Sequence, residues 1–169
     1  MLKECIILAG GLGTRLQSTV PDLPKCIAPV AGRPFLFYVI NYLRSQGIEK
    51  FIFSLGYLHE LVEDYLQKEF ATLSYTCSAE SEPLGTGGAI LLACSKTTEK
   101  EVLVVNGDTL FRGQFQDAFF FHTRQMAECT LLLKPMQEFD RYGVVETGTD
   151  QLVLSFKEKQ YYQSGNINA

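Results

Sequence analysis

Residues 5–16 read Cys-Ile-Ile-Leu-Ala-Gly-Gly-Leu-Gly-Thr-Arg-Leu, an apolar run that leads directly into a loop with three glycines and an arginine. The apolar residues predict a short buried strand. Gly10, Gly11 and Gly13 lack a Cβ, so the backbone there can take positive φ and bring its N–H groups close to an anion. Arg15 adds a permanent planar charge whose forked donors suit phosphate oxygens. The segment therefore predicts a phosphate-binding loop after a strand.

This loop departs from two common phosphate-binding patterns. A dinucleotide fingerprint needs a third glycine, but Leu16 stands in that place, and no acidic residue ends a second strand about 20 residues on. The P-loop pattern, with its lysine after the last glycine, is also absent. Two possibilities remain: a phosphate-binding loop of another kind, or a glycine-rich turn that binds no ligand.

The overall composition is that of one globular domain. The chain has 169 residues, of which 46% are apolar and 20% charged. A net charge of −4 argues against a general nucleic-acid binder, which needs a basic face. The five cysteines are scattered singly, and no apolar stretch reaches the roughly 18 residues of a membrane span. We therefore expect a cytoplasmic protein with no nucleic-acid and no membrane partner.

Apolar runs alternate with helix-like segments along the chain. Strands are expected over residues 4–8, 50–55, 73–78, 101–105 and 129–134, and helices over residues 35–45, 59–70, 87–94 and 115–125. Residues 144–146 and 151–157 are expected to form a hairpin with a turn at 147–150. The alternation indicates βαβ units and a largely parallel sheet, in which ligands bind outside the carboxyl ends of the strands.

Three further motifs follow expected strands or the glycine loop. Pro24 stiffens the backbone before Lys25, whose ammonium could return to the phosphate site; a solvated surface lysine is the alternative. Residues 82–89 read Glu-Pro-Leu-Gly-Thr-Gly-Gly-Ala. The small residues would let a flat base lie against the backbone; the alternative is that they only form a glycine-rich helix start. The segment Asn106-Gly107-Asp108 ends an expected strand and places there a carboxylate suited to Mg²⁺. The alternative is a turn in which Asp108 caps a helix.

In this order, the four motifs resemble the N-terminal part of the sugar-1-phosphate nucleotidyltransferases. The similarity continues through Tyr142-Gly143, Glu158-Lys159 and Asn168-Ala169, and so covers essentially the whole chain. Residues 23–30, 32–36 and 53–57 most resemble the branch that transfers guanylyl groups to D-glycero-D-manno-heptose 1-phosphate. The resemblance implies transfer of a nucleotidyl group from an NTP, with GTP favoured, to a sugar 1-phosphate, releasing pyrophosphate.

The resemblance also implies the roles of individual residues. Arg15, Lys25 and Asp108 would be catalytic, with Asp108 binding Mg²⁺. The nucleotide would be bound by Leu8, Ala9, Gly10, Gly11, Gly13, Thr14, Arg15, Pro83, Gly85, Thr86, Gly87 and Asn106. The sugar phosphate would be bound by Tyr142, Gly143, Glu158, Lys159 and Asn168.

The implied fold is α/β: a Rossmann-like, three-layer α/β/α nucleotidyltransferase fold with a mostly parallel central sheet, C-terminally incomplete. We expect a single domain over residues 1–169, with a nucleotide-binding part at 1–112 and a sugar-phosphate-binding part at 113–169, truncated after Ala169. In these enzymes the chain continues, and a second metal-binding aspartate lies in the later part. The sequence therefore predicts weak or no turnover by these residues alone, and leaves a homo-oligomer possible.

Three alternatives to this function stay open. The first keeps the chemistry but uses UTP, CTP or dTTP with a hexose 1-phosphate, which a comparison of thermal stabilisation by the four nucleotides would separate. The second is a non-catalytic module of the same fold that senses nucleotide sugars; replacing Asp108 would cost a sensor little and an enzyme nearly all of its activity. A dinucleotide-dependent oxidoreductase is a distant third, because the third glycine and the ribose-binding acid are absent.

Overall fold

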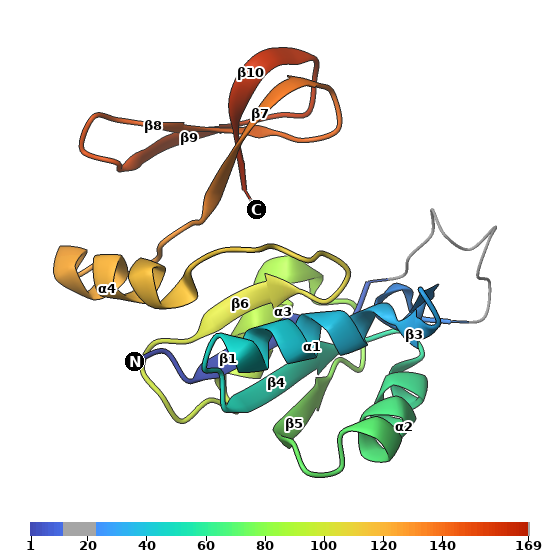
Figure 1. Cartoon of the computed structure of the whole chain (residues 1–169). Coiled ribbons are helices and arrows are strands. Elements are labelled where there is room, and N and C mark those ends of the chain that lie inside the picture. The colour runs from blue at the N-terminus through green and yellow to red at the C-terminus, as the bar shows by residue number, and fades with distance from the viewer. Residues whose placement is uncertain (12–22, 169) are drawn as a thin grey trace. The chain divides into compact units, whose positions relative to one another are not determined.

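The computed structural model describes residues 1–11 and 23–168, and it divides the chain into two compact units (Figure 1). The first unit, Met1–Gln116, contains β1 (Glu4–Leu8), η1 (Lys25–Ile27), β2 (Pro29–Val30), β3 (Arg33–Pro34), α1 (Phe35–Ser45), β4 (Lys50–Leu55), α2 (His59–Glu69), β5 (Ser74–Ala79), α3 (Gly85–Cys94) and β6 (Leu103–Asn106). Helix α4 (Phe115–Gln125) begins at the end of this unit. The second unit, Asp117–Ala169, contains β7 (Leu133–Phe139), β8 (Val144–Thr147), β9 (Val153–Lys157) and β10 (Tyr162–Asn168). The assignment of the chain to one domain stays a prediction.

The first unit is built on a four-stranded parallel sheet in the order β5-β4-β1-β6. Ile6 of β1 lies opposite Ile52 of β4 on one side and Val104 of β6 on the other. Right-handed crossovers place α1 and α2 on one face and α3 on the other face of such a sheet. Figure 1 shows α1 in front of the sheet and α3 behind it. The predicted α/β class, with helices flanking a parallel sheet, is confirmed.

The two central strands, β1 and β4, are buried along nearly all of their length, which explains why they are largely apolar. On the face covered by α3, Ile6 and Ile52 pack with Ala93 in a fully buried cluster. On the other face, the rings of Phe51 and Phe53 stack with their centroids 6.2 Å apart. This core fixes the four strand ends from which the site is built.

A buried carboxylate ties the start of β1 to its neighbours. Glu4 is 2% exposed, and its side chain accepts hydrogen bonds from Lys50 Nζ at 2.9 Å, from the backbone N–H of Thr98 at 2.8 Å and from the Thr98 hydroxyl. Burial by itself raises the pKa of this carboxyl, but the hydrogen bonds from Thr98 and Lys50 outweigh it and lower the pKa to about 2. Glu4 is therefore ionised in the folded chain at neutral pH.

The second unit consists of two antiparallel pairs, β7 with β10 and β8 with β9. Its small core contains Phe139, Val144 and Ile167, with Met136 and Tyr162 packed against them. The β8–β9 hairpin turns through residues 148–152, where Gly148 and Leu152 share a backbone hydrogen bond of 2.9 Å.

Most predicted elements are confirmed to within two residues at either end, but one strand was predicted in the wrong place. Residues 129–134 were expected to form a strand, whereas β7 spans Leu133–Phe139 and Cys129 is exposed. The reason is the antiparallel partner: β10 pairs with β7 from Leu133 opposite Asn168 to Phe139 opposite Tyr162. Pairing with a segment about 30 residues later cannot be read from a local apolar run.

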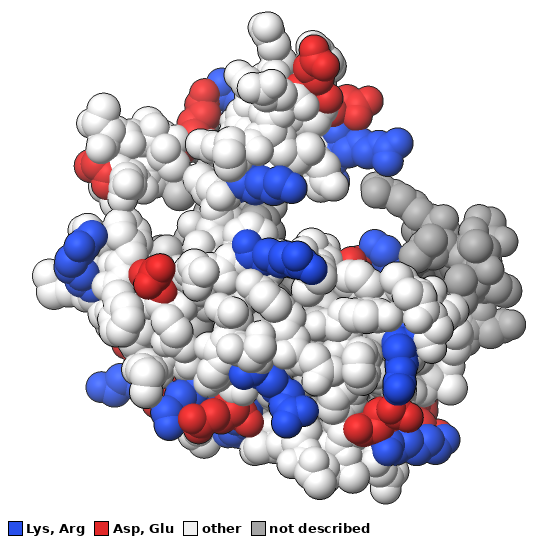
Figure 2. Space-filling view, in the orientation of Figure 1, with Lys and Arg blue, Asp and Glu red and all other residues white. Residues whose placement is uncertain are grey.

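Charged side chains are dispersed over the face seen in Figure 2, where Lys and Arg stand among Asp and Glu. Within residues 1–11 and 23–168, no helix has the length and apolar character needed to cross a bilayer.

Candidate functional site

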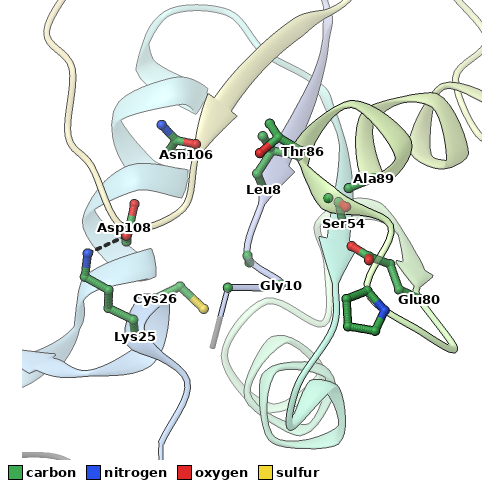
Figure 3. A pocket seen from close by; sticks show the side chains of 14 residues that line it. Leu8, Gly10, Lys25, Cys26, Ser54, Glu80, Thr86, Ala89, Asn106 and Asp108 are labelled. Atoms are coloured by element: carbon green, nitrogen blue, oxygen red, sulfur yellow. Dashed lines mark hydrogen bonds and ion pairs between the residues drawn. The ribbon is translucent and has the colours of Figure 1, made fainter. Parts of the chain in front are cut away.

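A cleft of about 550 Å³ opens at the carboxyl ends of the four parallel strands of the first unit (Figure 3). The residues that line it come from the ends of β1, β4 and β6, from the loops after β1, β5 and β6, and from η1 and the first five residues of α3. They are Leu8, Ala9, Gly10, Gly11, Lys25, Cys26, Ser54, Glu80, Pro83, Gly85, Thr86, Ala89, Asn106 and Asp108. The location is the one that ligands occupy in open parallel sheets.

The exit of β1 forms the floor of this cleft. The backbone N–H of Ala9, the first residue after β1, donates to the carbonyl of Ser54 at 2.8 Å. This hydrogen bond ties the exit of β1 to the end of β4. Positive φ was anticipated in the glycine loop, but neither Gly10 nor Gly11 adopts it. Gly10 is close-packed instead, because a Cβ there would lie 3.0 Å from the backbone nitrogen of Gly56. Gly13, Thr14 and Arg15 lie outside the described residues.

One wall of the cleft comes from the segment between β5 and α3. Glu80, immediately after β5, accepts a hydrogen bond on Oε2 from the backbone N–H of Leu84 at 2.8 Å. Helix α3 begins at Gly85, whose φ of +69° lies in the left-handed region that favours glycine. Gly85 and Thr86 both begin this helix and line the cleft. The two interpretations of the motif at residues 82–89, a wall for a base and a helix start, are therefore compatible. Gly87 does not line the cleft.

The opposite wall carries an ion pair between a lysine and an aspartate. Lys25 Nζ lies 2.5 Å from Asp108 Oδ2, and Figure 3 shows the two side chains meeting on one side of the cleft, one from η1 and the other from the loop after β6. Cys26 and Ile27 are buried and anchor η1, which holds Lys25 at the rim. Asp108 does not cap a helix, because the next helix, α4, begins only at Phe115.

The backbone before Asp108 is itself fixed to β1. The N–H of Gly107 donates to the carbonyl of Leu8 at 2.8 Å, so the carboxylate is held beside the exit of β1. Asn106 pairs with Leu8 in the sheet register and also lines the cleft. The structure therefore brings together the carboxylate, the lysine and the strand exit that the sequence proposed as one site.

Three lining residues, Cys26, Ser54 and Glu80, were not predicted from the sequence, and a fourth, Ala89, was predicted only as the end of the motif at residues 82–89. Glu80 could have been found, because it directly follows a strand whose carboxyl end faces the ligand side. Ser54 interrupts the apolar run from Phe51 to Leu55 in β4 and is 2% exposed. Burial raises the pKa of the Cys26 thiol to about 12, so this group is a neutral part of the wall.

The five residues expected to bind sugar phosphate all lie in the second unit. The ring of Tyr142 lies 6.5 Å from that of Phe139, and Gly143 faces the backbone carbonyl of Lys157. The carbonyl of Glu158 accepts a hydrogen bond from the Tyr162 hydroxyl at 2.8 Å. Lys159 follows Glu158, and Asn168 ends β10 opposite Leu133. Their proposed role stays a prediction.

The donor set of the cleft fits a magnesium ion that is shared with a substrate. Asp108 offers a carboxylate at the rim, and no group of three or more His, Cys, Asp or Glu side chains suited to a metal is found among the described residues. Mg²⁺ commonly binds through one or two carboxylates together with waters and substrate phosphates. Asp108 fits such a site, and its role as the metal ligand stays a prediction.

Comparison with known proteins defines the class. A family model described as nucleotidyl transferase matches residues 4–164, so this chain belongs to the nucleotidyl transferase family of enzymes.

Similar proteins share a narrower description. The chain is 52% identical to the D-glycero-alpha-D-manno-heptose 1-phosphate guanylyltransferase of Aneurinibacillus thermoaerophilus, over 98% of this chain and 71% of that protein. It is 42% identical to the enzyme of the same name from Campylobacter jejuni, over 98% of this chain and 72% of that protein. Among solved structures it resembles HddC from Yersinia pseudotuberculosis complexed with GMP-PN. That match has a TM-score of 0.87 and 34% identity, over 99% of this chain and 74% of HddC.

Proposed function

We propose that this protein transfers a guanylyl group from GTP to a manno-heptose 1-phosphate, forming a GDP-heptose and pyrophosphate. The observation that carries the proposal is the cleft that joins the exit of β1, the wall at Gly85 and Thr86, and the Lys25–Asp108 pair. The choice of substrates is supported by the relatives that are 52% and 42% identical to this chain over 165 aligned residues. The guanine nucleotide is further supported by the similarity to HddC, whose structure contains GMP-PN.

The proposed reaction needs charge compensation more than it needs a strong base. A phosphate oxygen of the sugar 1-phosphate attacks the α-phosphorus of GTP in line, the bond to the β-phosphate breaks, and pyrophosphate leaves. The attacking oxygen is already anionic at neutral pH, so the main obstacle is repulsion between two polyanions. Lys25 supplies positive charge in the cleft, and Arg15 and Lys159 are proposed to do the same for the triphosphate and the sugar phosphate. Mg²⁺ held by Asp108 would neutralise phosphate charge when bound.

Glu80 supports guanine as the base. Its carboxylate lines the cleft on the wall away from the Lys25–Asp108 pair, and none of the ion pairs in the described part of the chain involves it. The Watson–Crick edge of guanine presents two adjacent donors, N1–H and N2–H, and a carboxylate accepts two such bonds side by side. Uracil, cytosine and thymine lack this pair of donors.

A pyrophosphate-release assay tests the proposal. We expect release with GTP, Mg²⁺ and D-glycero-α-D-manno-heptose 1-phosphate, and at least ten-fold lower kcat/KM when UTP, CTP or dTTP replaces GTP. Mannose 1-phosphate and glucose 1-phosphate serve as sugar controls. A preference for UTP or dTTP would overturn the guanylyl assignment. Stabilisation by GTP without any pyrophosphate release, also in a C-terminally extended chain, would favour a nucleotide sensor.

A further inference from the structure

Two glycines from different loops are in direct backbone contact beneath the cleft. A Cβ on Gly56, which follows β4, would lie 2.8 Å from the carbonyl oxygen of Gly10 and 3.2 Å from its Cα. In the other direction, a Cβ on Gly10 would lie 3.0 Å from the nitrogen of Gly56 and 3.2 Å from the carbonyl carbon of Leu55. Such short Cβ contacts with backbone atoms cannot be relieved by a side-chain rotation. The backbone of one loop or the other would have to move.

The glycine at position 56 is explained by this contact and not by backbone conformation. Gly32, Gly47 and Gly85 are the described glycines with positive φ, and Gly56 is not among them. An alanine at this position would meet no penalty from its own φ. Gly56 does not line the cleft. A side chain at this position is therefore excluded by the backbone of Gly10 and not by a ligand.

The backbone of Gly56 cannot easily give way, because hydrogen bonds fix the chain on both sides of it. Just before it, the carbonyl of Ser54 accepts from Ala9 at 2.8 Å, and the carbonyl of Leu55 accepts from Glu80 at 2.9 Å. After it, the N–H of His59 donates to the carbonyl of Gly56 at 3.1 Å, where α2 begins. The exits of β1, β4 and β5 are thereby held together, and a Cβ at position 56 would press against the backbone of Gly10.

We propose that Gly56 is a positioning residue for the nucleotide. Because Gly56 has no side chain, the backbone of Gly10 and Gly11 can lie directly against it, and this contact fixes their position in the cleft. The position of Gly10 and Gly11 in turn determines the affinity for the nucleoside triphosphate. This inference rests on the proposed function, in which the exit of β1 binds GTP. It assigns to the β4–α2 loop a part in substrate binding, although Gly56 itself touches no substrate.

The substitution Gly56→Ala tests this role by separating the two substrates. We expect the KM for GTP to rise about ten-fold, because small misplacements of binding groups carry large costs. The KM for the sugar 1-phosphate should stay within two-fold of its value in the unaltered chain. The matched control is Ile40→Val, a fully buried position on α1 away from the cleft, which should lower the melting temperature and leave both KM values unchanged. Equal changes in both KM values, or an unchanged KM for GTP in Gly56→Ala, would overturn the proposal.

A second measurement uses the unaltered chain and does not depend on the variant folding. We expect GTP to slow hydrogen exchange at the amides of residues 55–57 as well as 8–11, because seating the nucleotide presses Gly10 onto Gly56. Protection at 8–11 without any change at 55–57 would contradict the positioning role. If GTP protects neither segment and no pyrophosphate is released, the proposed function itself fails, which is a distinguishable result.

Discussion

The two units bury their strands in opposite ways. In the first unit, β1 and β4 lie inside a parallel sheet, and Ile6, Ile52 and Phe53 are 0% exposed. In the second unit, β9 is half of a two-stranded hairpin, and Leu154 and Phe156 are 70% and 65% exposed. A strand that is covered on both faces has its position fixed by burial alone. A two-stranded ribbon gains much less from burial and depends on its pairing partner.

The largest effect is expected from a cavity in the core of the first unit. Ile52→Ala removes a fully buried side chain between Ile6 and Ala93, and should cost about 4 kcal/mol of unfolding free energy. Ile167→Ala, in the small core of the second unit, should cost about 2 kcal/mol, because its cluster is smaller and can relax. Urea unfolding of both variants measures the difference. Equal costs would show that the two cores are equally consolidated.

The cleft of the first unit should depend on Asp108 for activity and not for stability. Asp108→Asn should lower pyrophosphate release by about 10² to 10³, equivalent to about 3 to 4 kcal/mol, because a preorganised charge is lost. The melting temperature should change little, since an exposed ion pair such as Lys25–Asp108 is worth about 1 kcal/mol or less. Asp64→Asn, an equivalent change on the exposed face of α2, should leave activity unaltered. Activity that survives in Asp108→Asn would remove this residue from the mechanism.

The first unit should also lose stability in acid through Glu4. Its pKa is lowered to about 2 in the folded chain, against about 4.3 for an ordinary glutamate. The contribution of the ionised Glu4 carboxylate to the free energy of unfolding is therefore complete above about pH 5 and is lost as the pH falls from there towards pH 2. It amounts to about 3 kcal/mol. Glu4→Gln should be less stable than the unaltered chain at pH 7, and its unfolding free energy should fall less between pH 5 and pH 2.5. Parallel pH profiles for the two proteins would contradict the prediction.

The smallest effect is expected at an exposed ring of the second unit. Phe156→Ser should change the unfolding free energy by about 0.5 kcal/mol or less, because the ring is mostly exposed. Val145→Ala, at the position paired with Phe156 in the hairpin but only 3% exposed, should cost several times more. Urea unfolding compares them. A large cost for Phe156→Ser would mean that this ring is covered in solution.

This comparison also explains where the sequence predicted the structure. The strand from Glu4 to Leu8 and the strand from Lys50 to Leu55 were predicted to the residue, because short, predominantly apolar runs have one stable location in a buried sheet. The strand expected at 129–134 begins instead at Leu133, because its position depends on β10. The proposed site was found at the ends of β1 and β6, whereas Glu80, which directly follows β5, was missed although its position after a strand could have indicated it, and Ser54, inside β4, was brought to the cleft by packing.

The sequence by itself determined the class of fold, the order of the βαβ units and the residue types gathered at the strand ends. These follow from periodicity and turn chemistry, which are local properties of the chain. Only the tertiary structure decided that Lys25 meets Asp108, 83 positions away, and that Gly10 lies against Gly56. Contacts of that kind depend on how separate strands pack side by side, and no local pattern encodes the distance between their ends.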